Sequence, residues 1–594
     1  MSRADWIVLI ITLLTILAYG LYKSRTTKDL DGYFLSNRSM PWYLVLLSIM
    51  GTQASAVTFL SAPGQAFTDG MRFVQYYFGL PLAMIVISIS FVPIFRKLQV
   101  FTAYEFLEQR FDVKTRTFTS FLFLLSRGFS TGISIYAPSI ILSSVLGWDI
   151  FWTNIVMGGI LIIYTVSGGA KAVAYTQQLQ LGIIFSAMFI AGFYIVHNMP
   201  ANVSFRDALK VSGASGKLNV ITTGFSENGF QWKDRYNIIS GLVAGFFFSL
   251  SYFGTDQTQV GRYLTAKNTT ESRMGLLMNG FVKVPMQFLI LLLGALLFTF
   301  YQFTSGPVFF NKALQDKVYS SGKGEGLKRI EGQFEKMAAR RTTYAKQYVE
   351  ALHSRPDQVA VYKDSLQQTN QQIGILRNAY KSDLRKTGVD TNDTDYIFIR
   401  FVFDNLPVGL VGLLIAIIFL ASWGSIAAAL NSLASCTMID FYCRFKKGIA
   451  HPLALDTDKL KKYNQSKWFT FGWGLFCIAV AQFSSRLGSL IEAVNIYGSI
   501  FYGVILGIFL VAFYMKKIGG QAVFLASIIS ELGVILLFIL DNKGILGIGF
   551  LWLTVVGAIG VVILSWIINF FFGEKEKSPS AGKEDFLSVG KKSF

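Results

Sequence analysis

Long apolar stretches recur along the whole chain and are separated by shorter polar segments. A run of about 18 or more apolar residues is long enough to cross a bilayer as a helix. The pattern therefore predicts an all-α polytopic membrane protein with about 13 transmembrane helices. The expected spans are 5–22, 41–65, 74–96, 117–147, 150–167, 176–197, 236–261, 274–302, 399–441, 467–485, 488–515, 521–541 and 546–572.

Polar positions interrupt two of these spans. The second contains Gly51 to Ala56 and ends at Pro63-Gly64, and the seventh contains Ser249 to Gln257. Each begins a block of five spans, 41–197 and 236–515, and an odd number of spans makes the two blocks inverted relative to each other. Broken helices at matching positions of two inverted halves are typical of secondary transporters. The alternative is that the glycines only allow close helix packing.

The segment 303–398 departs from the apolar pattern. It is polar, opens with Gly322, Gly324 and Gly326, and has helical patterning at Gln333–His353 and Gln358–Leu384 on either side of Pro356. We call it the insertion. A helical hairpin covering the outer mouth is favoured over a module that binds a partner protein, which stays open.

Composition supports a membrane protein. The chain has 594 residues, of which 52% are hydrophobic and 15% charged, whereas soluble domains carry about 25% charged residues. The net charge of +19 comes largely from lysines and arginines in alternate loops, so it indicates topology and not a nucleic-acid partner. The positive-inside rule places the N-terminus outside and the C-terminus inside. The first run, 6–22, lacks signal-peptide features and is expected to remain as a helix.

These patterns divide the chain into consecutive parts. The expected division is an extra N-terminal helix and cytoplasmic loop at 1–40, a first repeat at 41–197, an outer loop at 198–235, a second repeat at 236–515 interrupted by the insertion, two C-terminal helices at 516–572 and a cytoplasmic tail at 573–594.

Motifs for other functions are absent from the sequence. It has no Walker A, metalloprotease or nucleophile-elbow motif, and its cysteines, Cys436, Cys443 and Cys477, lie in or beside apolar spans. We expect neither an enzyme nor ATP-driven transport, and no disulfide framework or zinc site.

Four motifs in order resemble the sodium/solute symporter family. They are QASAVTFL at 53–60, FTAYEFLEQRF at 101–111, GGAKAVAYT at 168–176 and DQTQVGRYL at 256–264. The first is most similar to the iodide, monocarboxylate and multivitamin branch, and bacterial members are also similar. The resemblance covers 5–572 apart from the insertion. It implies a LeuT-like five-plus-five inverted-repeat transporter fold and sodium-coupled uptake of a solute.

The resemblance also implies a sodium site between the second and ninth spans. Carbonyl oxygens would come from Gly51, Ala54 and Ala421, and hydroxyl oxygens from positions 424 and 425. Sodium is a hard cation that prefers such oxygen ligands. Ser425 fits, but Gly424 has no hydroxyl, so water, Ser422 or Ser55 would have to replace it. The alternative for Ser425 is a hydrogen bond to its own helix.

A second sodium site of some family members is not retained. Its acidic residue corresponds to Gln177, and its hydroxyl positions correspond to Ala427 and Ala428. The resemblance therefore predicts at most one sodium ion per cycle.

The solute is expected near the midplane between the broken helices. The candidate lining residues are Gln53, Thr58, Ser249, Tyr252, Lys283, Glu492 and Asn495.

Lys283 is the sharpest of these, because an ammonium group in a membrane span is costly unless it faces a partner or a cavity. It aligns with a lysine that contacts sugar in a galactose-transporting relative, although it could instead extend to the interface. Glu492 either pairs with a cation or is solvated, Tyr252 is an inner gate or a packing residue, and Arg127 is a structural or gating charge.

The function expected from these features is sodium-coupled uptake of a small organic solute, such as a sugar, a sialic-acid-like compound or an organic anion, by alternating access. The alternatives are a proton-coupled or uncoupled transporter, or a non-transporting solute sensor on the same fold. We expect a bacterial cell membrane as the location, with lipid as the surroundings and a monomer or weak oligomer as the assembly.

Overall fold

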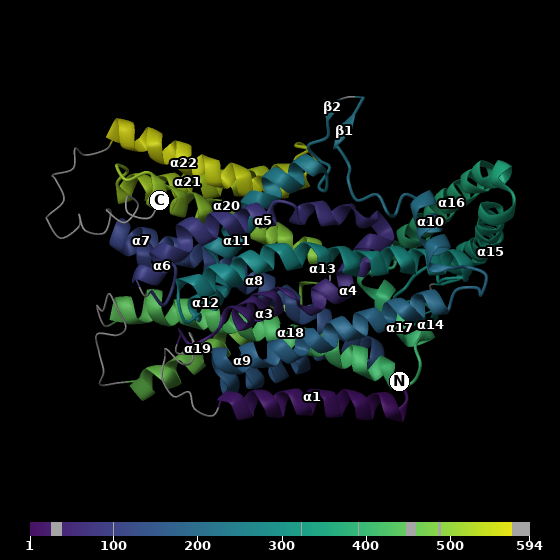
Figure 1. Ribbon diagram of the computed structural model, residues 1–594, viewed down its shortest axis with the longest axis horizontal. Helices are drawn as coiled ribbons and strands as arrows, with labels where there is room; N and C mark the ends of the chain where they lie inside the picture. Colours follow the sequence, from purple (N-terminus) through teal and green to yellow (C-terminus); the bar gives the residue numbers. More distant parts are fainter. Residues whose placement is uncertain are drawn as a thin grey trace.

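The computed structural model describes residues 1–24, 38–98, 100–227, 229–321, 324–389, 391–446, 459–484 and 489–572. The predicted cytoplasmic tail at 573–594, residues 25–37 of the first cytoplasmic loop, and Gly322 lie outside these residues. Nearly all of the described chain is helical, and the helices run side by side along the long axis of the molecule (Figure 1).

The helices agree with the predicted spans. The main membrane elements are α1 (Arg3–Ser24), α3 (Trp42–Gln53), α4 (Ala56–Asp69), η2 (Met71–Tyr77), α5 (Leu80–Val86), η3 (Ile87–Phe91), α6 (Val92–Leu98), α8 (Val113–Leu146), α9 (Ile150–His197), η4 (Ser240–Ala244), α11 (Gly245–Gly254), α12 (Gln257–Leu264), α13 (Thr269–Phe303), α18 (Leu410–Cys436), η7 (Thr437–Lys446), α19 (Lys459–Ala481), α20 (Leu490–Tyr514), α21 (Gly520–Asn542) and α22 (Leu551–Phe572).

Length and hydropathy identify 9 membrane-crossing helices in the described residues, or 10 when α3 and α4 count as one broken span. The apolar helices Ile150–Val166 and Ser240–Gly254, together with α19, fall at the remaining predicted positions. The one clear error in a boundary concerns the predicted span 399–441. A separate helix, α17 (Ile397–Asn405), precedes α18, because Pro407 and the positive φ of Gly409 (92°) end one helix before the next begins.

α9 is a hairpin and not a single crossing. Its two apolar parts are Ile150–Val166 and Val173–His197. The hydroxyl groups of Tyr164 and Thr176 lie 3.0 Å apart, although 12 residues of straight helix would separate them by about 18 Å. The chain therefore turns back between them and supplies two spans, as the sequence predicts.

Both predicted helix breaks are present. α3 and α4 meet at Ala54-Ser55 with a bend of 62°. α11 ends at Gly254, and α12 begins after Thr255 and Asp256, whose carboxylate caps the new helix through the Thr258 N–H at 2.7 Å. α18 packs between α8, α9, α1 and α3, and almost every residue along it is buried. A helix that is apolar on all sides belongs in such a central position.

The insertion forms a helical hairpin, as predicted. α15 (Glu325–Ser354) and α16 (Val359–Lys386) pack together on either side of Pro356, next to α14 (Lys312–Ser320). They enclose a small apolar core of their own around Phe309, Phe334 and Tyr380. Figure 1 shows this hairpin at one end of the bundle, and we call that end the insertion side.

Polar contacts hold the insertion to the bundle. The Thr342 hydroxyl on α15 donates to the Gln302 carbonyl oxygen on α13 at 3.1 Å. Within the insertion, buried Asp393 pairs with Arg377 at 2.7 Å and with Lys381 at 2.5 Å. His353 lies 3.1 Å from Asp207 on α10 (Phe205–Ala214). α1 begins on the insertion side and α22 ends on the opposite side (Figure 1), as an odd number of crossings requires. A short hairpin of β1 (Phe225–Ser226) and β2 (Gly229–Phe230) completes the fold.

The side opposite the insertion is tied together by Asp440 in η7. Its fully buried carboxylate accepts hydrogen bonds from Thr102 at 2.8 Å, from Ser120 at 3.0 Å and from Arg116 at 2.7 Å. Arg116 also pairs with Glu108 of α7 (Glu105–Arg110) at 2.8 Å. One carboxylate thus links the loop before α7 to α8 and to the end of α18.

We predict that Asp440→Asn destabilises the protein by about 3–5 kcal/mol, because removing one partner leaves the buried Arg116 charge incompletely paired. The measurement is thermal unfolding of the purified protein. The matched control is Asp316→Asn, the same change at an exposed position, which should leave the melting temperature unchanged. Equal melting temperatures for the two variants would show that the cluster contributes nothing to stability.

Candidate functional site

A central cavity of about 120 Å³ lies between the two helix breaks. Its lining residues come from α3, α4, η2, α5, α8, α11, α13 and α20. Six of the seven solute residues predicted from the sequence line this cavity. They are Gln53, Thr58, Ser249, Tyr252, Lys283 and Asn495.

Gln53 and Thr58 shape the cavity wall at the first break. The Thr58 hydroxyl donates to the Gln53 carbonyl oxygen at 3.1 Å, across the two residues that are not helical. The Gln53 side-chain amide donates to Asn279 on α13 at 3.3 Å. The break is thus closed by side chains that also face the cavity, so a solute bound there would contact groups that fix the bend.

Lys283 places its side-chain amino group at the cavity. The residue is 2% exposed, and its Nζ lies 5.6 Å from the centre of the Tyr77 ring. No carboxylate forms an ion pair with it in the described part of the chain. A buried ammonium group is costly without a partner. The cavity therefore favours a solute that supplies a negative charge or strong hydrogen-bond acceptors.

The second cation of the cavity, Arg127, is already paired. Its guanidinium contacts Asp256 and donates to the Tyr502 hydroxyl at 3.1 Å, and that hydroxyl donates to Asp256 at 2.8 Å. Its Cζ also lies 5.3 Å from the centre of the Tyr252 ring. Because Asp256 caps α12, this network fixes the second break. The geometry agrees with the expectation that Arg127 is a structural or gating charge.

Glu492 does not line the cavity. Its carboxylate pairs with Arg235 at 2.7 Å and accepts a hydrogen bond from Tyr236 at 3.3 Å. The geometry thus supports the pairing alternative and gives no support to a solute contact. Sequence reasoning missed the lining residues Tyr76, Tyr77 and Tyr502, because tyrosines are common in membrane spans and these three follow no motif.

The predicted sodium site falls where α3 and α4 pack against α18. The end of α3 leaves carbonyl oxygens without helical partners, and Gly51 and Ala54 lie there. On α18, the Ser425 hydroxyl donates to the Ser422 carbonyl oxygen at 3.1 Å. In this conformation Ser425 thus makes a hydrogen bond to its own helix, which is the alternative role considered for it in the sequence analysis. This bond uses only the hydroxyl hydrogen, so the oxygen keeps lone pairs that can bind a cation.

Gln177 fills the space beside this junction. Its Oε1 accepts from the Ser48 hydroxyl at 3.1 Å, and its Nε2 donates to the Thr52 hydroxyl at 3.3 Å and to the Gly424 carbonyl oxygen at 3.1 Å. The orientation of the amide follows from chemistry, because a carbonyl oxygen can only accept. The side chain is fully buried and joins α3, α9 and α18.

Two glycines make room for this glutamine. A Cβ at Gly51 would lie 2.7 Å from the Gln177 Cβ. A Cβ at Gly424 would lie 2.7 Å from Gln180 Oε1 and 3.2 Å from Gln177 Cγ. Gln177 therefore occupies part of the space that a side chain at position 424 would need. The absence of a hydroxyl at 424 and the presence of glutamine at 177 thus depend on each other. Sequence reasoning noted both residues but not their contact, and it missed Gln180.

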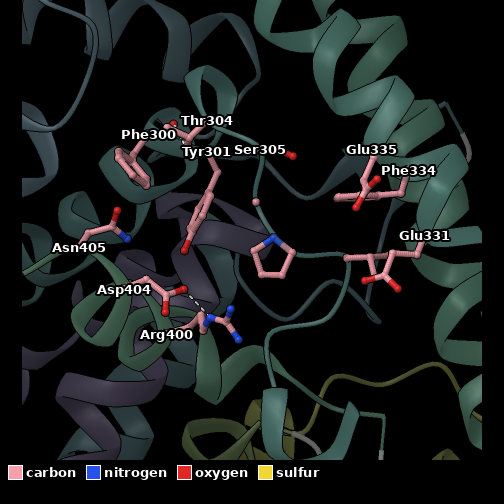
Figure 2. Close-up of a pocket in the computed structure, with 13 residues that line it drawn as sticks. Phe300, Tyr301, Thr304, Ser305, Glu331, Phe334, Glu335, Arg400, Asp404 and Asn405 are labelled. Atoms are coloured by element: carbon pink, nitrogen blue, oxygen red, sulfur yellow. Dashed lines mark hydrogen bonds and ion pairs between the residues drawn. The ribbon is translucent and has the colours of Figure 1, made fainter. Parts of the chain in front are cut away.

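A different cavity, of about 370 Å³, lies where the insertion meets the ends of α13 and α17. Arg400 and Asp404 form an ion pair at 2.5 Å. Figure 2 shows this pair on one side of the cavity and Glu331 and Glu335 on the other. None of the predicted sodium or solute residues lines it, so it is separate from the central cavity.

The fold is shared with a known transporter. The chain superposes on the solved structure of a substrate-bound, outward-open Na+-coupled sialic acid symporter with a TM-score of 0.71, at 21% sequence identity, over 96% of this chain and 98% of the other. This likeness confirms the predicted LeuT-like architecture.

Sequence comparisons give the family. The chain is 24% identical to the sodium/sialic acid symporter NanT of Aliivibrio fischeri over 95% of this chain and 92% of that protein. It is 30% identical to the sodium-coupled monocarboxylate transporter 1 of Xenopus laevis over 46% of this chain and 43% of that protein. The profile of the sodium:solute symporter family matches residues 33–313 and 373–530, so the chain belongs to this family of secondary transporters.

Proposed function

We propose that the protein takes up a small organic anion together with one sodium ion by alternating access. The observation that carries the proposal is Lys283, a buried ammonium group that faces the central cavity without a carboxylate partner among the described residues. The relatives named for sialic acid and for monocarboxylates handle anions of this kind. A neutral sugar would leave the ammonium charge uncompensated, which disfavours it.

The contacts of Gln177 support the ion count. Its amide hydrogens point at the Thr52 hydroxyl and the Gly424 carbonyl oxygen, so a cation cannot share these oxygens without displacing the glutamine. The remaining candidate ligands are the carbonyl oxygens of Gly51, Ala54 and Ala421 and the hydroxyl of Ser425. They form one site for a hard cation.

The sodium and solute sites share the first break. The predicted ion ligands Gly51 and Ala54 flank Gln53, which lines the solute cavity. We infer that sodium fixes the end of α3 in the conformation that presents Gln53 and Thr58 to the solute. The Arg127–Asp256 pair would keep the opposite side closed until the solute is bound.

We propose the same membrane topology as the one predicted from the sequence. Residues 41–197 and 236–515 form the inverted repeats, and the insertion side faces outward. The N-terminus is outside and the C-terminus inside a cell membrane, which we take to be bacterial.

We predict that sodium, compared with potassium, stabilises the purified protein by about 2.7 kcal/mol at 100 times the dissociation constant, and that Ser425→Ala loses most of this effect. The measurement is thermal unfolding in matched salts. Ser432→Ala is the control, because Ser432 also bonds back to α18, at 3.0 Å, and should keep the sodium effect.

Two results would count against this sodium site. An equal sodium effect in Ser425→Ala would place the ion elsewhere. No sodium effect in the unmodified protein would favour proton-coupled or uncoupled transport, or a sensor.

We predict that in sodium, lactate or N-acetylneuraminate stabilises the protein and galactose does not. Lys283→Gln should weaken binding of the effective anion by about 10- to 150-fold, because a hydrogen bond to a charged group contributes about 1.5–3 kcal/mol. Thermal-shift titration measures both effects. Lys210→Gln, at an exposed position, is the control. Stabilisation by galactose that survives Lys283→Gln would contradict an anionic solute.

A further inference from the structure

A larger cavity, of about 650 Å³, lies at the insertion side. Its walls come from α15 and α16, from the ends of α4 and α13, and from the loop at 215–217. All of α15 and the first half of α16 fall in the gap of the family profile between 313 and 373. The insertion of this chain therefore builds much of the wall, and we call the space the outer cavity.

Arg341 on α15 is the first of four cations that line the outer cavity. It is 6% exposed, and its Nε has no hydrogen-bond partner among the described residues. The one hydrogen bond that its side chain makes to them runs from Nη2 to the Thr304 carbonyl oxygen at 3.4 Å. Burial lowers the pKa of Arg341 to about 10. A buried guanidinium with unused donors is costly unless a ligand satisfies it.

Lys217 reaches the same cavity from the loop before β1. Its Nζ donates to the Thr68 carbonyl oxygen and lies 4.9 Å from the centre of the Phe298 ring. The pKa of Lys217 is lowered to about 8, mainly by burial, with Asp69 opposing the shift and the nearby charges of Arg377 and Arg72 adding to it. The charge of Arg377 thus already disfavours the ammonium form here.

Positive charge exceeds negative charge in the outer cavity. Arg377 and Lys381 share the single carboxylate of Asp393. No aspartate or glutamate is among the described residues that line the cavity. Neutral polar side chains and aromatic rings also line the cavity, and Phe67 and Phe310 are in edge-to-face contact at 5.6 Å. Guanidinium and ammonium donors beside aromatic rings suit an organic carboxylate, whose charged end meets the donors and whose apolar part meets the rings.

Two helices lead from the outer cavity to the central cavity. α4 lines the central cavity at Thr58 and the outer one at Phe67, about 13 Å further along the helix. α13 does the same at Lys283 and Phe298, about 22 Å apart. Because α4 and α13 pack together, the two cavities are stacked along one helix pair.

We propose that the outer cavity is a second binding site for an organic carboxylate, which captures the solute before it enters the central cavity. The statement that the captured anion is also the transported solute rests on the proposed function. The existence of the site does not.

The experiment measures binding of 4-(trifluoromethyl)benzoate to the full chain in nanodiscs by fluorine NMR line broadening. All proteins carry Lys283→Gln, so that the central cavity contributes little, and 4-(trifluoromethyl)benzamide is the neutral control ligand. We expect the carboxylate to bind and the amide not to bind. Adding Arg341→Gln should weaken binding by about 10-fold or more, the effect of losing one charge-assisted hydrogen bond. Arg340→Gln, an exposed neighbour on the same helix, should leave binding unchanged.

A second measurement keeps all four cations in place, in case Arg341→Gln does not fold. A nitroxide attached at Arg340→Cys should broaden the signal of the bound carboxylate, because position 340 adjoins the cavity wall. The native cysteines Cys436, Cys443 and Cys477 are buried and should remain unlabelled.

Each outcome decides the proposal. Equal binding of the amide, unchanged binding in Arg341→Gln, or no effect of the nitroxide would overturn it. Loss of all carboxylate binding with Lys283→Gln alone would also overturn it. Carboxylate binding that depends on Arg341 in a protein that transports no anion would uphold the outer site and refute only the proposed function.

Discussion

The two helix breaks impose the constraint on which the rest of the structure depends. In lipid, an unpaired backbone N–H or C=O costs several kcal/mol, so a broken helix persists only where protein or a water-filled cavity surrounds it. At the first break, the Thr58 hydroxyl bonds the Gln53 carbonyl oxygen. At the second, Asp256 caps α12 and is held by Arg127 and Tyr502. Gln53, Thr58, Arg127 and Tyr502, which take part in these contacts, also line the central cavity.

The two cations near these breaks differ in whether a carboxylate pairs with them. Arg127 pairs with Asp256, whereas no carboxylate among the described residues pairs with Lys283. At the predicted ion site, the neutral amide of Gln177 donates hydrogen bonds to the Thr52 hydroxyl and the Gly424 carbonyl oxygen. The same contrast between paired and unpaired cations recurs in the outer cavity, between Arg377 and Arg341. Lys283 and Arg341 each line a cavity.

Much of the architecture follows from local patterns in the sequence. Apolar runs locate the spans, the polar interruptions at 51–56 and 249–257 locate the breaks, and Pro356 separates the two insertion helices. These features depend on residues close together in the chain. The boundary before α18 was wrong because the predicted span was extended across Asp404 to Gly409, where polar residues, Pro407 and Gly409 mark a turn.

The candidate site could be predicted only in part, because its decisive contacts are distant in sequence. Gln177 meets Gly424 across 247 positions, and Glu492 meets Arg235 across 257. No local pattern shows that the first pair fills space beside the ion site or that the second removes Glu492 from the cavity. The outer cavity could not be predicted from the sequence either, because its cations come from three separate segments, a loop, α15 and α16.

The central claim is that one sodium ion accompanies one organic anion. It is tested most directly by the effect of membrane potential on sodium-driven uptake of the transported monovalent anion into proteoliposomes. One sodium with one such anion moves no net charge, so the account predicts the same initial rate with and without an inside-negative potassium diffusion potential, and equal fluxes of labelled sodium and anion. Faster uptake at negative potential, with two sodium ions per anion, would contradict it and would show that Gln177 does not exclude a second ion.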